Sequence, residues 1–355
     1  MKAAVVSDFG DVDAVLTVIE DHPRPVLKKG SGKMLVRVQA CSLSPGDCRM
    51  INGDAKIVKK PPSWPYVPGG DVCGVVEEVD EDSKSKFRVG DSVVGSWENF
   101  GIGGMAELTL VDTKLAVKKP PNLIPVEAAA MANSPVNALL AVRDAGIKSG
   151  HRVLIIGGSG GMGTSIVQMA RDANAAFIAV TSTDDALMKS LGVDVVVDYS
   201  MGNWWEAPEL KGPGGEPFDV IIDCAEGSST WTRVQGDRSL IKAGSKGGRF
   251  LAVVWNEWTI IIERWSDMFG LMCPVLGRVI MSRVRSSSVP KYSVMFPAPR
   301  GDNTMEELFA LAEEGKVKPV LDKSSPFPFT TEGVRGAFRL QESRHAHGKV
   351  VVEIA

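Results

Sequence analysis

The chain has 355 residues, of which 44% are hydrophobic and 23% charged, and its 40 basic and 43 acidic side chains leave a formal net charge of −3. This composition is that of a globular protein and excludes the disordered and fibrous classes. The balanced charge argues against a protein built to bind nucleic acid, so we expect a small-molecule ligand. The length predicts two domains.

The five cysteines indicate a reducing compartment, because their number is odd and no C-x-x-C spacing suggests a disulfide framework or a zinc knuckle. The N-terminus MKAAVVSDFGDVDAV lacks the apolar core of a signal peptide. No apolar run reaches the roughly 18 residues that a membrane span needs. We therefore expect a cytoplasmic protein, or an organellar one if a transit peptide has been removed.

The first 120 residues have the pattern of an all-β domain. Short β-branched runs alternate there with clusters of Gly, Pro, Asn and Asp, which is typical of hairpins and barrel-like strands. The predicted strands are residues 1–6, 34–40, 72–79, 92–95 and 106–111.

A helical region begins near residue 125, where VEAAAMANSPVNALLAVRDAG predicts a bridging helix that Gly146 would end. Apolar strands then alternate with helical patterns. This alternation predicts a Rossmann-type α/β fold, a doubly wound parallel sheet with helices on both faces. The expected strands are residues 153–156, 177–180, 195–197 and 220–223, and the expected helices are 164–173 and 186–191.

Residues 255–292 mix bulky apolar and basic side chains without one clear period. Three interpretations remain: a Rossmann strand with its helix, a dimer surface, or a membrane-facing stretch. We favour core plus interface over membrane contact, because an amphipathic membrane helix needs a clean apolar face opposite its arginines.

A glycine-rich loop has the pattern G-x-G-x-x-G, directly after an apolar strand and before an amphipathic helix. We expect Gly158 to take the tight turn, Gly160 to let the backbone approach a diphosphate, and Gly163 to let the helix pack closely. The N–H groups at the helix start would then face the anion. The predicted loop residues are Gly158, Ser159, Gly160, Gly161, Met162 and Gly163.

The second strand ends in Thr181, Ser182 and Thr183, where a site specific for NAD would place a carboxylate against the ribose. Small hydroxyl residues tolerate a 2′-phosphate, so NADPH is favoured and NADH stays a second candidate. Asp184 and Asp185 would repel the phosphate unless they point to solvent or cap the next helix.

Several segments together resemble the zinc-free quinone oxidoreductase branch of the medium-chain dehydrogenase/reductase superfamily, and the resemblance covers nearly the whole chain. The resemblance rests on the order and spacing of these segments more than on any single segment. They are CSLSPGD, YVPGGDVCGVVEEVD, VGDSVVG, GGMAELTLV, GGSGGMG, LGVDVVVDY, FDVIIDCAEG, GGRFLAV, EEGKVKPVLD and HGKVVVEI.

The resemblance implies a GroES-like β-barrel domain at residues 1–125 and 318–355, a Rossmann domain at 126–317, and a homodimer. Zinc members have Cys where this chain has Ser44 or Pro45, and Gly-His-Glu where it has Gly69-Gly70-Asp71. With histidines only at 22, 151, 345 and 347, we expect no metal site.

Tyr199 and Arg344 fall at positions that contact the 2′-phosphate in some quinone oxidoreductases. The alternatives are a half-buried strand end for Tyr199 and a solvated surface charge for Arg344. Two departures affect the expected substrate pocket. The chain has Ser44-Pro45-Gly46-Asp47 where the family commonly has Asn-Pro-x-Asp, and Asn137 where a Thr is often found.

The resemblance implies an enzyme, an NADPH-dependent reductase that transfers hydride to a quinone or an α,β-unsaturated carbonyl. The candidate groups for stabilising the oxyanion are Ser44, Asn137, Tyr66, ordered water and the cofactor's ribose hydroxyl. Tyr66 is either a proton donor or a pocket wall. The alternative function is an NADPH-binding protein of weak or lost catalysis, whose contact surface is the segment around residues 255–285.

Overall fold

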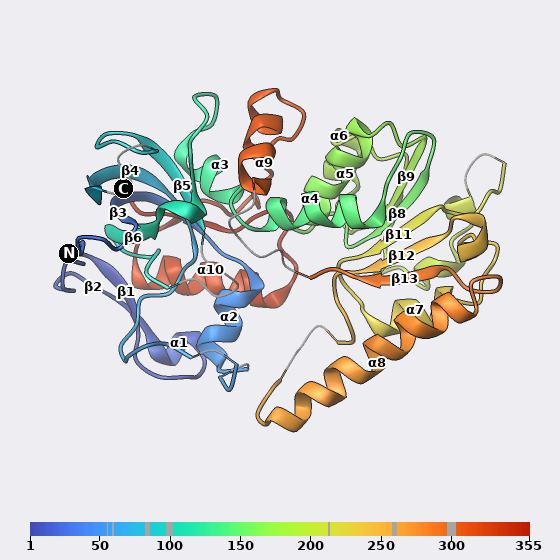
Figure 1. Ribbon diagram of the computed structural model, residues 1–355, viewed down its shortest axis with the longest axis horizontal. Helices are drawn as coiled ribbons and strands as arrows, with labels where there is room; N and C mark the ends of the chain where they lie inside the picture. Colours follow the sequence, from blue (N-terminus) through green and yellow to red (C-terminus); the bar gives the residue numbers. More distant parts are fainter. Residues whose placement is uncertain are drawn as a thin grey trace. The chain divides into compact units, whose positions relative to one another are not determined.

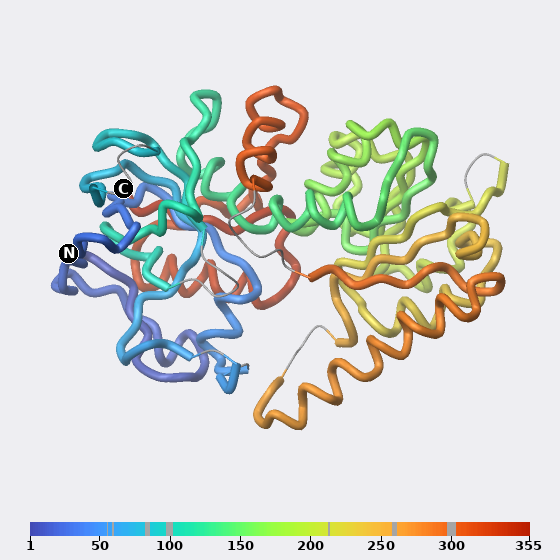
Figure 2. The backbone as a smooth tube through the Cα atoms, viewed as in Figure 1, coloured from blue at the N-terminus to red at the C-terminus, as the bar shows by residue number. Residues whose placement is uncertain are grey.

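The computed structural model describes residues 1–54, 56–58, 60–81, 86–96, 102–211, 214–257, 261–296 and 303–355. The chain forms two compact units. Unit 1 comprises Met1–Val136 and Pro299–Ala355, and unit 2 comprises Asn137–Ala298. Both termini therefore lie in unit 1, and the chain leaves it once and returns (Figure 2).

Unit 2 contains a six-stranded sheet in the order β10-β9-β8-β11-β12-β13. Every neighbouring pair is parallel. Helices α5 and α6 cover one face, and α7 and α8 cover the other (Figure 1). This is the doubly wound order with its switch point between β8 and β11. The strands are β8 (Arg152–Ile156), β9 (Phe177–Thr181), β10 (Val195–Val197), β11 (Val220–Asp223), β12 (Arg249–Ala252) and β13 (Lys291–Val294).

The expected strands of this sheet formed because their side chains are apolar on both faces, which only a doubly covered sheet can bury. All residues of β8, β9 and β11 are buried. The helices around the sheet are α4 (Ser134–Ala145), α5 (Gly163–Asp172), α6 (Asp185–Ser190), α7 (Ser228–Val234) and α8 (Trp265–Val284).

The single bridging helix expected near residue 125 is wrong, because the structure has two. Helix α3 (Pro125–Ala130) ends before α4 begins at Ser134. Pro135 explains the break, since proline lacks an N–H, disfavours a helical residue before it and suits the first turn of a new helix.

Unit 1 contains a seven-stranded sheet in the order β14-β15-β3-β4-β5-β7, with β6 also paired to β3. The long β3 pairs with β6 near its start and with β15 near its end, so the sheet curls. A two-stranded sheet joins β1 to β2. The strands are β1 (Ala3–Val6), β2 (Leu16–Ile19), β3 (Lys33–Ser42), β4 (Asp71–Val79), β5 (Ser92–Ser96), β6 (Leu108–Asp112), β7 (Ala116–Lys118), β14 (Phe327–Pro328) and β15 (Val351–Glu353).

The chain's last strand belongs to unit 1, because β15 pairs antiparallel with β3. The remaining helices of this unit are α1 (Val12–Val15), α2 (Pro45–Asn52), α9 (Thr304–Glu313) and α10 (Thr331–Ser343). The boundaries of the compact units differ from the expected 125/126 and 317/318. Helix α3 packs on β3 and β4, and α9 packs on β7, so both belong to unit 1.

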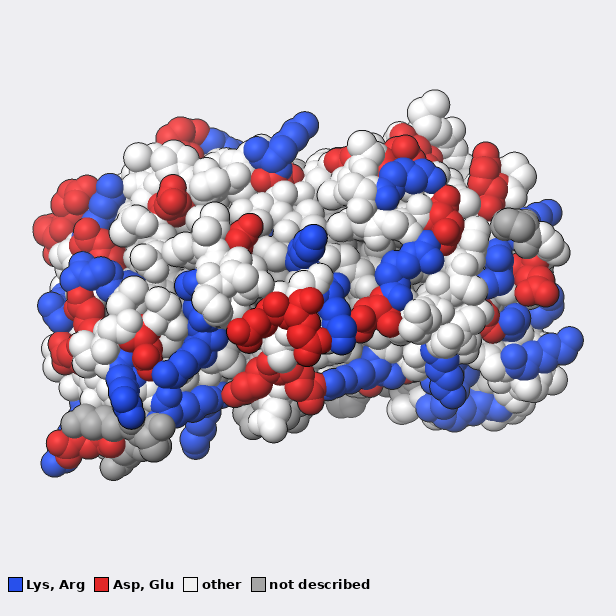
Figure 3. Space-filling view, turned by 90° about the horizontal axis from the view of Figure 1, so that it is seen from above, with Lys and Arg blue, Asp and Glu red and all other residues white. Residues whose placement is uncertain are grey.

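The segment that the sequence left ambiguous is a Rossmann helix and strand, α8 and β13. Within the described ranges, no helix is both long and apolar enough to cross a bilayer. On the face drawn in Figure 3, acidic and basic side chains are interspersed.

Candidate active site

The glycine-rich loop joins β8 to α5 at the carboxyl edge of the parallel sheet. This is the switch point, where open α/β sheets bind their ligands. The structure assigns the tight turn to Gly157, with φ of 82°, and not to Gly158 as the sequence suggested. Gly157 was missed because the motif's spacing starts one residue later.

The other glycines of the loop differ in how closely the chain surrounds them. A Cβ on Gly163 would lie 2.2 Å from the carbonyl oxygen of Gly157, and one on Gly158 would lie 2.6 Å from Cβ of Val180. A Cβ on Gly160 would meet its nearest atom at 3.7 Å, an ordinary contact. Packing of the chain therefore requires Gly158 and Gly163, whereas nothing in the chain itself requires Gly160.

The start of α5 presents backbone donors without acceptors. The N–H groups of Gly161 and Met162 have no hydrogen-bond acceptor among the described residues. The first N–H groups of a helix lack intrahelical partners and carry a partial positive charge. The loop can therefore bind an anion, as the motif predicts.

The hydroxyl residues after β9 occupy three different environments. Thr181 is buried and its hydroxyl accepts a hydrogen bond from the N–H of Gly157 at 2.9 Å. Ser182 is also buried, and its hydroxyl accepts from the N–H of Asp184 at 3.0 Å. Thr183 is exposed. Asp184 caps α6 by accepting from the N–H of Leu187, so the capping interpretation is confirmed for that carboxylate.

Tyr199 and Arg344 lie in different units. Tyr199 is 40% exposed and follows β10 by two residues, as Thr183 follows the paired strand β9. These two side chains therefore belong to the same edge of the sheet. Arg344 is exposed in unit 1 and ends α10 with φ of 63°.

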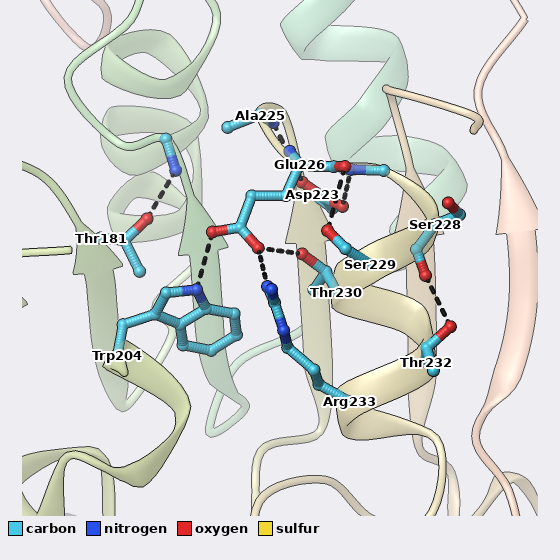
Figure 4. A network of polar contacts seen from close by, with 12 residues as sticks. Thr181, Trp204, Asp223, Ala225, Glu226, Ser228, Ser229, Thr230, Thr232 and Arg233 are labelled. Carbon is cyan, nitrogen blue, oxygen red and sulfur yellow. Dashed lines mark hydrogen bonds and ion pairs between the residues drawn. The ribbon is translucent and has the colours of Figure 1, made fainter. Parts of the chain in front are cut away.

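A second loop at this edge, which the sequence analysis did not single out, follows β11. The buried carboxylate of Asp223 accepts hydrogen bonds from the N–H groups of Ala225, Glu226 and Gly227 at 2.7–3.0 Å (Figure 4). Burial raises the pKa of Asp223 to about 6, against the lowering effect of these three bonds. The carboxylate therefore fixes the loop's shape from within.

Glu226 extends this network outward. Its carboxylate accepts from the indole of Trp204 at 2.8 Å and from the hydroxyl of Thr230 at 3.0 Å, and pairs with Arg233 at 2.6 Å (Figure 4). This loop contacts the glycine loop, because a Cβ on Gly157 would lie 3.0 Å from that of Ala225. An Asp at the end of an apolar strand, followed by Gly227, was the available sequence signal.

Ser44 of unit 1 has its hydroxyl fully engaged within the chain. The hydroxyl donates to Asp71 at 3.1 Å and accepts from the ammonium of Lys349 at 3.2 Å. All three side chains are buried. The proton of Ser44 is therefore committed to a carboxylate, and an oxyanion would have to displace that bond.

Lys349 is the buried cation of this cluster, and the sequence analysis did not identify its role. Its ammonium donates to the carbonyl of Leu43 and the hydroxyls of Ser44 and Ser134, and lies 4.0 Å from Asp71. Burial lowers the pKa of Lys349, and the carboxylates of Asp71 and Asp47 oppose that shift.

Asp47 and Tyr66 each hold a buried polar atom without a partner among the described residues, namely Oδ1 of Asp47 and the hydroxyl of Tyr66. Burial, then the charge of Asp71, raises the pKa of Asp47 to about 7. Burial also raises the pKa of Tyr66 well above its usual range. An unsatisfied buried hydroxyl costs roughly 1–3 kcal/mol, so each group favours a ligand that can pair with it.

Asn137 lies half-buried in α4 and begins unit 2. A search of the described ranges finds no group of three or more His, Cys, Asp or Glu side chains that could hold a metal ion.

Family models match both parts of the chain. Residues 30–121 match the alcohol dehydrogenase GroES-like domain, and residues 191–352 match the model described as zinc-binding dehydrogenase. A 2-methylene-furan-3-one reductase of Solanum lycopersicum is 30% identical over 99% of this chain and 79% of its own length. The chain belongs to the medium-chain dehydrogenase/reductase superfamily.

Other named oxidoreductases are also similar to this chain over nearly its whole length. A chloroplastic NADPH-dependent alkenal/one oxidoreductase of Arabidopsis thaliana is 30% identical over 99% of this chain and 79% of its own. The human mitochondrial NAD(P)H oxidoreductase RTN4IP1 is 29% identical over all of this chain and 89% of its own. The predicted relationship to quinone and enone oxidoreductases is confirmed.

Solved structures establish the fold. The quinone oxidoreductase of Escherichia coli, in complex with NADPH, superposes with a TM-score of 0.76 at 20% identity, covering 99% of this chain and all of the other. That of Coxiella burnetii gives 0.76 at 24% identity, covering all of this chain and 99% of its own. The predicted combination of a Rossmann sheet and a GroES-like domain is confirmed.

Proposed function

We propose that this chain is an NADPH-dependent reductase that transfers hydride to a quinone or an α,β-unsaturated carbonyl without a metal. The observation that carries the proposal is the glycine loop at the switch point of the sheet, in a chain related over 99% of its length to a named NADPH-dependent alkenal/one oxidoreductase. When bound, NADPH supplies the hydride, and the protein supplies binding and orientation.

In this proposal, different residues of the chain bind different parts of the cofactor. The N–H groups of Gly161 and Met162 bind the diphosphate, and the absence of a side chain at Gly160 lets the anion approach. Thr183 and Tyr199 border the ribose 2′-phosphate from adjacent strands, and Arg344 pairs with that phosphate. Thr181 acts indirectly, because its hydroxyl holds the turn at Gly157.

Tyr66 is the proposed donor to the substrate's carbonyl oxygen. Its hydroxyl is buried and unpartnered among the described residues, and burial keeps its pKa high, so it stays protonated. The hydroxyl of Ser44 is already committed to Asp71 and Lys349, which makes Ser44 the weaker candidate. Asn137 remains a candidate second donor from unit 2.

The test compares oxidation of NADPH and NADH by purified protein with phenanthrenequinone, benzoquinone and a short enone as acceptors. We expect turnover with NADPH and a much lower kcat/KM with NADH. Turnover with NADH alone would overturn the cofactor assignment. Tight NADPH binding without turnover across the panel would favour the binding-protein alternative.

The compartment is proposed as the cytosol, or the interior of an organelle if a leader is removed. All five cysteines are free thiols, which suits a reducing compartment. Two of the named relatives are a chloroplastic and a mitochondrial protein. Imaging of a fluorescent fusion of the full precursor distinguishes the two locations.

A further inference from the structure

A cavity of about 260 Å³ lies between helices α7 and α8 of unit 2, and the proposed chemistry does not use it. Pockets for drug-sized ligands measure roughly 300–1,000 Å³, so this cavity suits a smaller molecule. Three exposed residues of α8, namely Gly277, Met281 and Arg285, form its rim. The cavity therefore opens to solvent.

The cavity lies toward the edge of the sheet where the parallel strands begin, away from the glycine loop. Helix α7 starts at the carboxyl edge, directly after the loop that follows β11, and Gln235 of the cavity lies at its far end. Val289, another lining residue, lies between the end of α8 and the start of β13 (Figure 1). A ligand in this cavity would therefore not compete with a dinucleotide at the glycine loop.

Buried side chains form the floor of the cavity, and the surface that they offer is chiefly apolar. They are Trp231, Ser282 and Val289. The hydroxyl of Ser282 donates to the carbonyl of Val279 at 2.9 Å and accepts from the N–H of Tyr292 at 3.0 Å, so it already both donates and accepts. The ring of Trp231 meets that of Tyr292 edge to face, with 4.7 Å between centroids, which fixes the aromatic part of the floor.

The sides and rim of the cavity carry two positive charges that no acidic side chain balances. Arg285 is exposed, and its guanidinium has no hydrogen bond or ion pair among the described residues. Arg278 is half-buried and donates to the carbonyl of Trp255 at 2.7 Å, a neutral acceptor. None of the described residues that line the cavity is Asp or Glu. Guanidinium groups pair with carboxylates through two parallel hydrogen bonds, so this charge favours an anionic ligand.

Other arginines already serve the C-terminal ends of the two helices, where basic side chains compensate the helix dipole. Arg238 donates to the carbonyls of Val234 and Gln235 at the end of α7. Arg283 donates to the carbonyl of Val279 in α8 at 2.9 Å. Compensation of the helix dipole therefore does not require Arg285.

We propose that this cavity binds a small organic monoanion, a carboxylate on an apolar body. The apolar body packs against Trp231 on the floor, and the carboxylate pairs with Arg285 and Arg278 at the opening. Gly277 keeps the entrance wide, because a Cβ added there would meet nothing within 4 Å in the chain. Glycine is unfavourable inside a helix relative to alanine, and an open entrance gives it a role.

The first test is calorimetric titration of the full chain with phenylacetate, with and without saturating NADPH. We expect one site whose affinity NADPH does not change. Phenylacetamide, acetate and inorganic phosphate should each bind at least about tenfold more weakly, because each lacks either the charge or the apolar body. Absence of phenylacetate binding, its displacement by NADPH, or equal affinity for any of the three other compounds would overturn the proposal.

The second test uses two pairs of variants on α8. Arg285→Gln should weaken phenylacetate binding at least about tenfold, whereas Arg283→Gln, which removes an arginine outside the cavity, should not change it. Gly277→Leu should block the entrance. Gly270→Leu is its control, because a Cβ there also meets nothing within 4 Å but lies outside the cavity. Circular dichroism and unfolding curves show that each variant folds. Undiminished affinity in folded Gly277→Leu, or equal losses in the two arginine variants, would contradict the assignment.

Discussion

The hydroxyl of Thr181 accepts a hydrogen bond from the backbone N–H of Gly157 at 2.9 Å. This contact joins the end of β9 to the tight turn that opens the glycine loop. The position of Thr181 would assign it to the cofactor's ribose, but its hydroxyl instead holds the turn of the loop that we propose binds the diphosphate.

Thr181→Val should lower the free energy of unfolding by about 1 kcal/mol, because it leaves the partly buried N–H of Gly157 unpaired at nearly unchanged side-chain volume. It should also weaken NADPH binding by loosening the turn at Gly157. Thr181→Ser keeps the hydroxyl and serves as the control. Urea unfolding and calorimetric titration measure both effects, and equal stability of the two variants would contradict the assigned role.

Substitutions at two glycines of the loop should affect different properties, one the stability of the protein and the other its affinity for NADPH. Gly163→Ala should destabilise the protein by several kcal/mol, because the new Cβ lies 2.2 Å from the oxygen of Gly157. Gly160→Ala should leave stability nearly unchanged, since its Cβ meets only an ordinary contact at 3.7 Å. It should nevertheless weaken NADPH binding at least tenfold. Undiminished affinity in folded Gly160→Ala would remove the diphosphate from this loop.

Lys349 and Asp71 form a buried pair, so removing one of the two side chains should lower the free energy of unfolding substantially. Lys349→Met should cost about 3–5 kcal/mol, because it leaves a carboxylate buried without its cation. Lys118→Met removes an exposed ion pair with Asp91 and should cost at most about 1 kcal/mol. Denaturant unfolding measures the stability of both variants. If both variants lose the same free energy of unfolding, the buried cluster stabilises the protein no more than a surface ion pair does.

Asp47 predicts a pH dependence of stability with a definite sign. Its pKa rises from 3.8 to about 7 on folding, chiefly through burial, so the folded chain binds this proton more tightly than the unfolded chain. Its contribution is fully present below the unfolded pKa and is lost as pH rises through about 7. Asp47→Asn should remove this loss of stability, about 2–4 kcal/mol, because the amide does not ionise. Its oxygen can still accept the hydrogen bond from the N–H of Ser44.

Unfolding curves of wild type and Asp47→Asn, taken on either side of this pH window, check the prediction. The variant should gain stability relative to wild type at the alkaline end. A difference that does not change with pH would mean that Asp47 is ionised throughout in the folded protein.

Tyr66→Phe should lower kcat roughly a hundredfold, the size expected when a general acid is removed, and leave the Kd for NADPH unchanged. Stability should stay the same or rise slightly, because the hydroxyl lost has no partner among the described residues. Steady-state kinetics with an enone and calorimetric titration measure these quantities. An unchanged kcat would make Tyr66 a wall of the pocket.

The parallel sheet could be predicted because Val153, Ile178 and Ile221 lie in runs that are apolar on both faces. The glycine loop could be predicted because its motif is local in sequence. The turn at Gly157 could not, since adjacent glycines do not reveal which one takes a positive φ. The break before Pro135 was visible as a proline signal, but the surrounding Ala and Leu residues outweighed it.

The buried cluster of unit 1 was beyond sequence reasoning for a different reason. Lys349 contacts Leu43 across 306 residues of chain, and no periodicity links such distant segments. A lysine next to the last strand has the same local pattern whether it is exposed or buried. Similarly, the sequence of α8 does not reveal that only Val275 and Ser282 of this helix are buried, because only the fold decides which face of a helix is covered.

The central claim is hydride transfer from NADPH to an electrophilic carbon of the substrate. The most direct measurement is the mass spectrum of the product formed from an enone and NADPH deuterated at the transferable position of the nicotinamide. The proposed function predicts one deuterium on the β-carbon of the saturated ketone. An unlabelled product, or no product despite saturating NADPH binding, would contradict it.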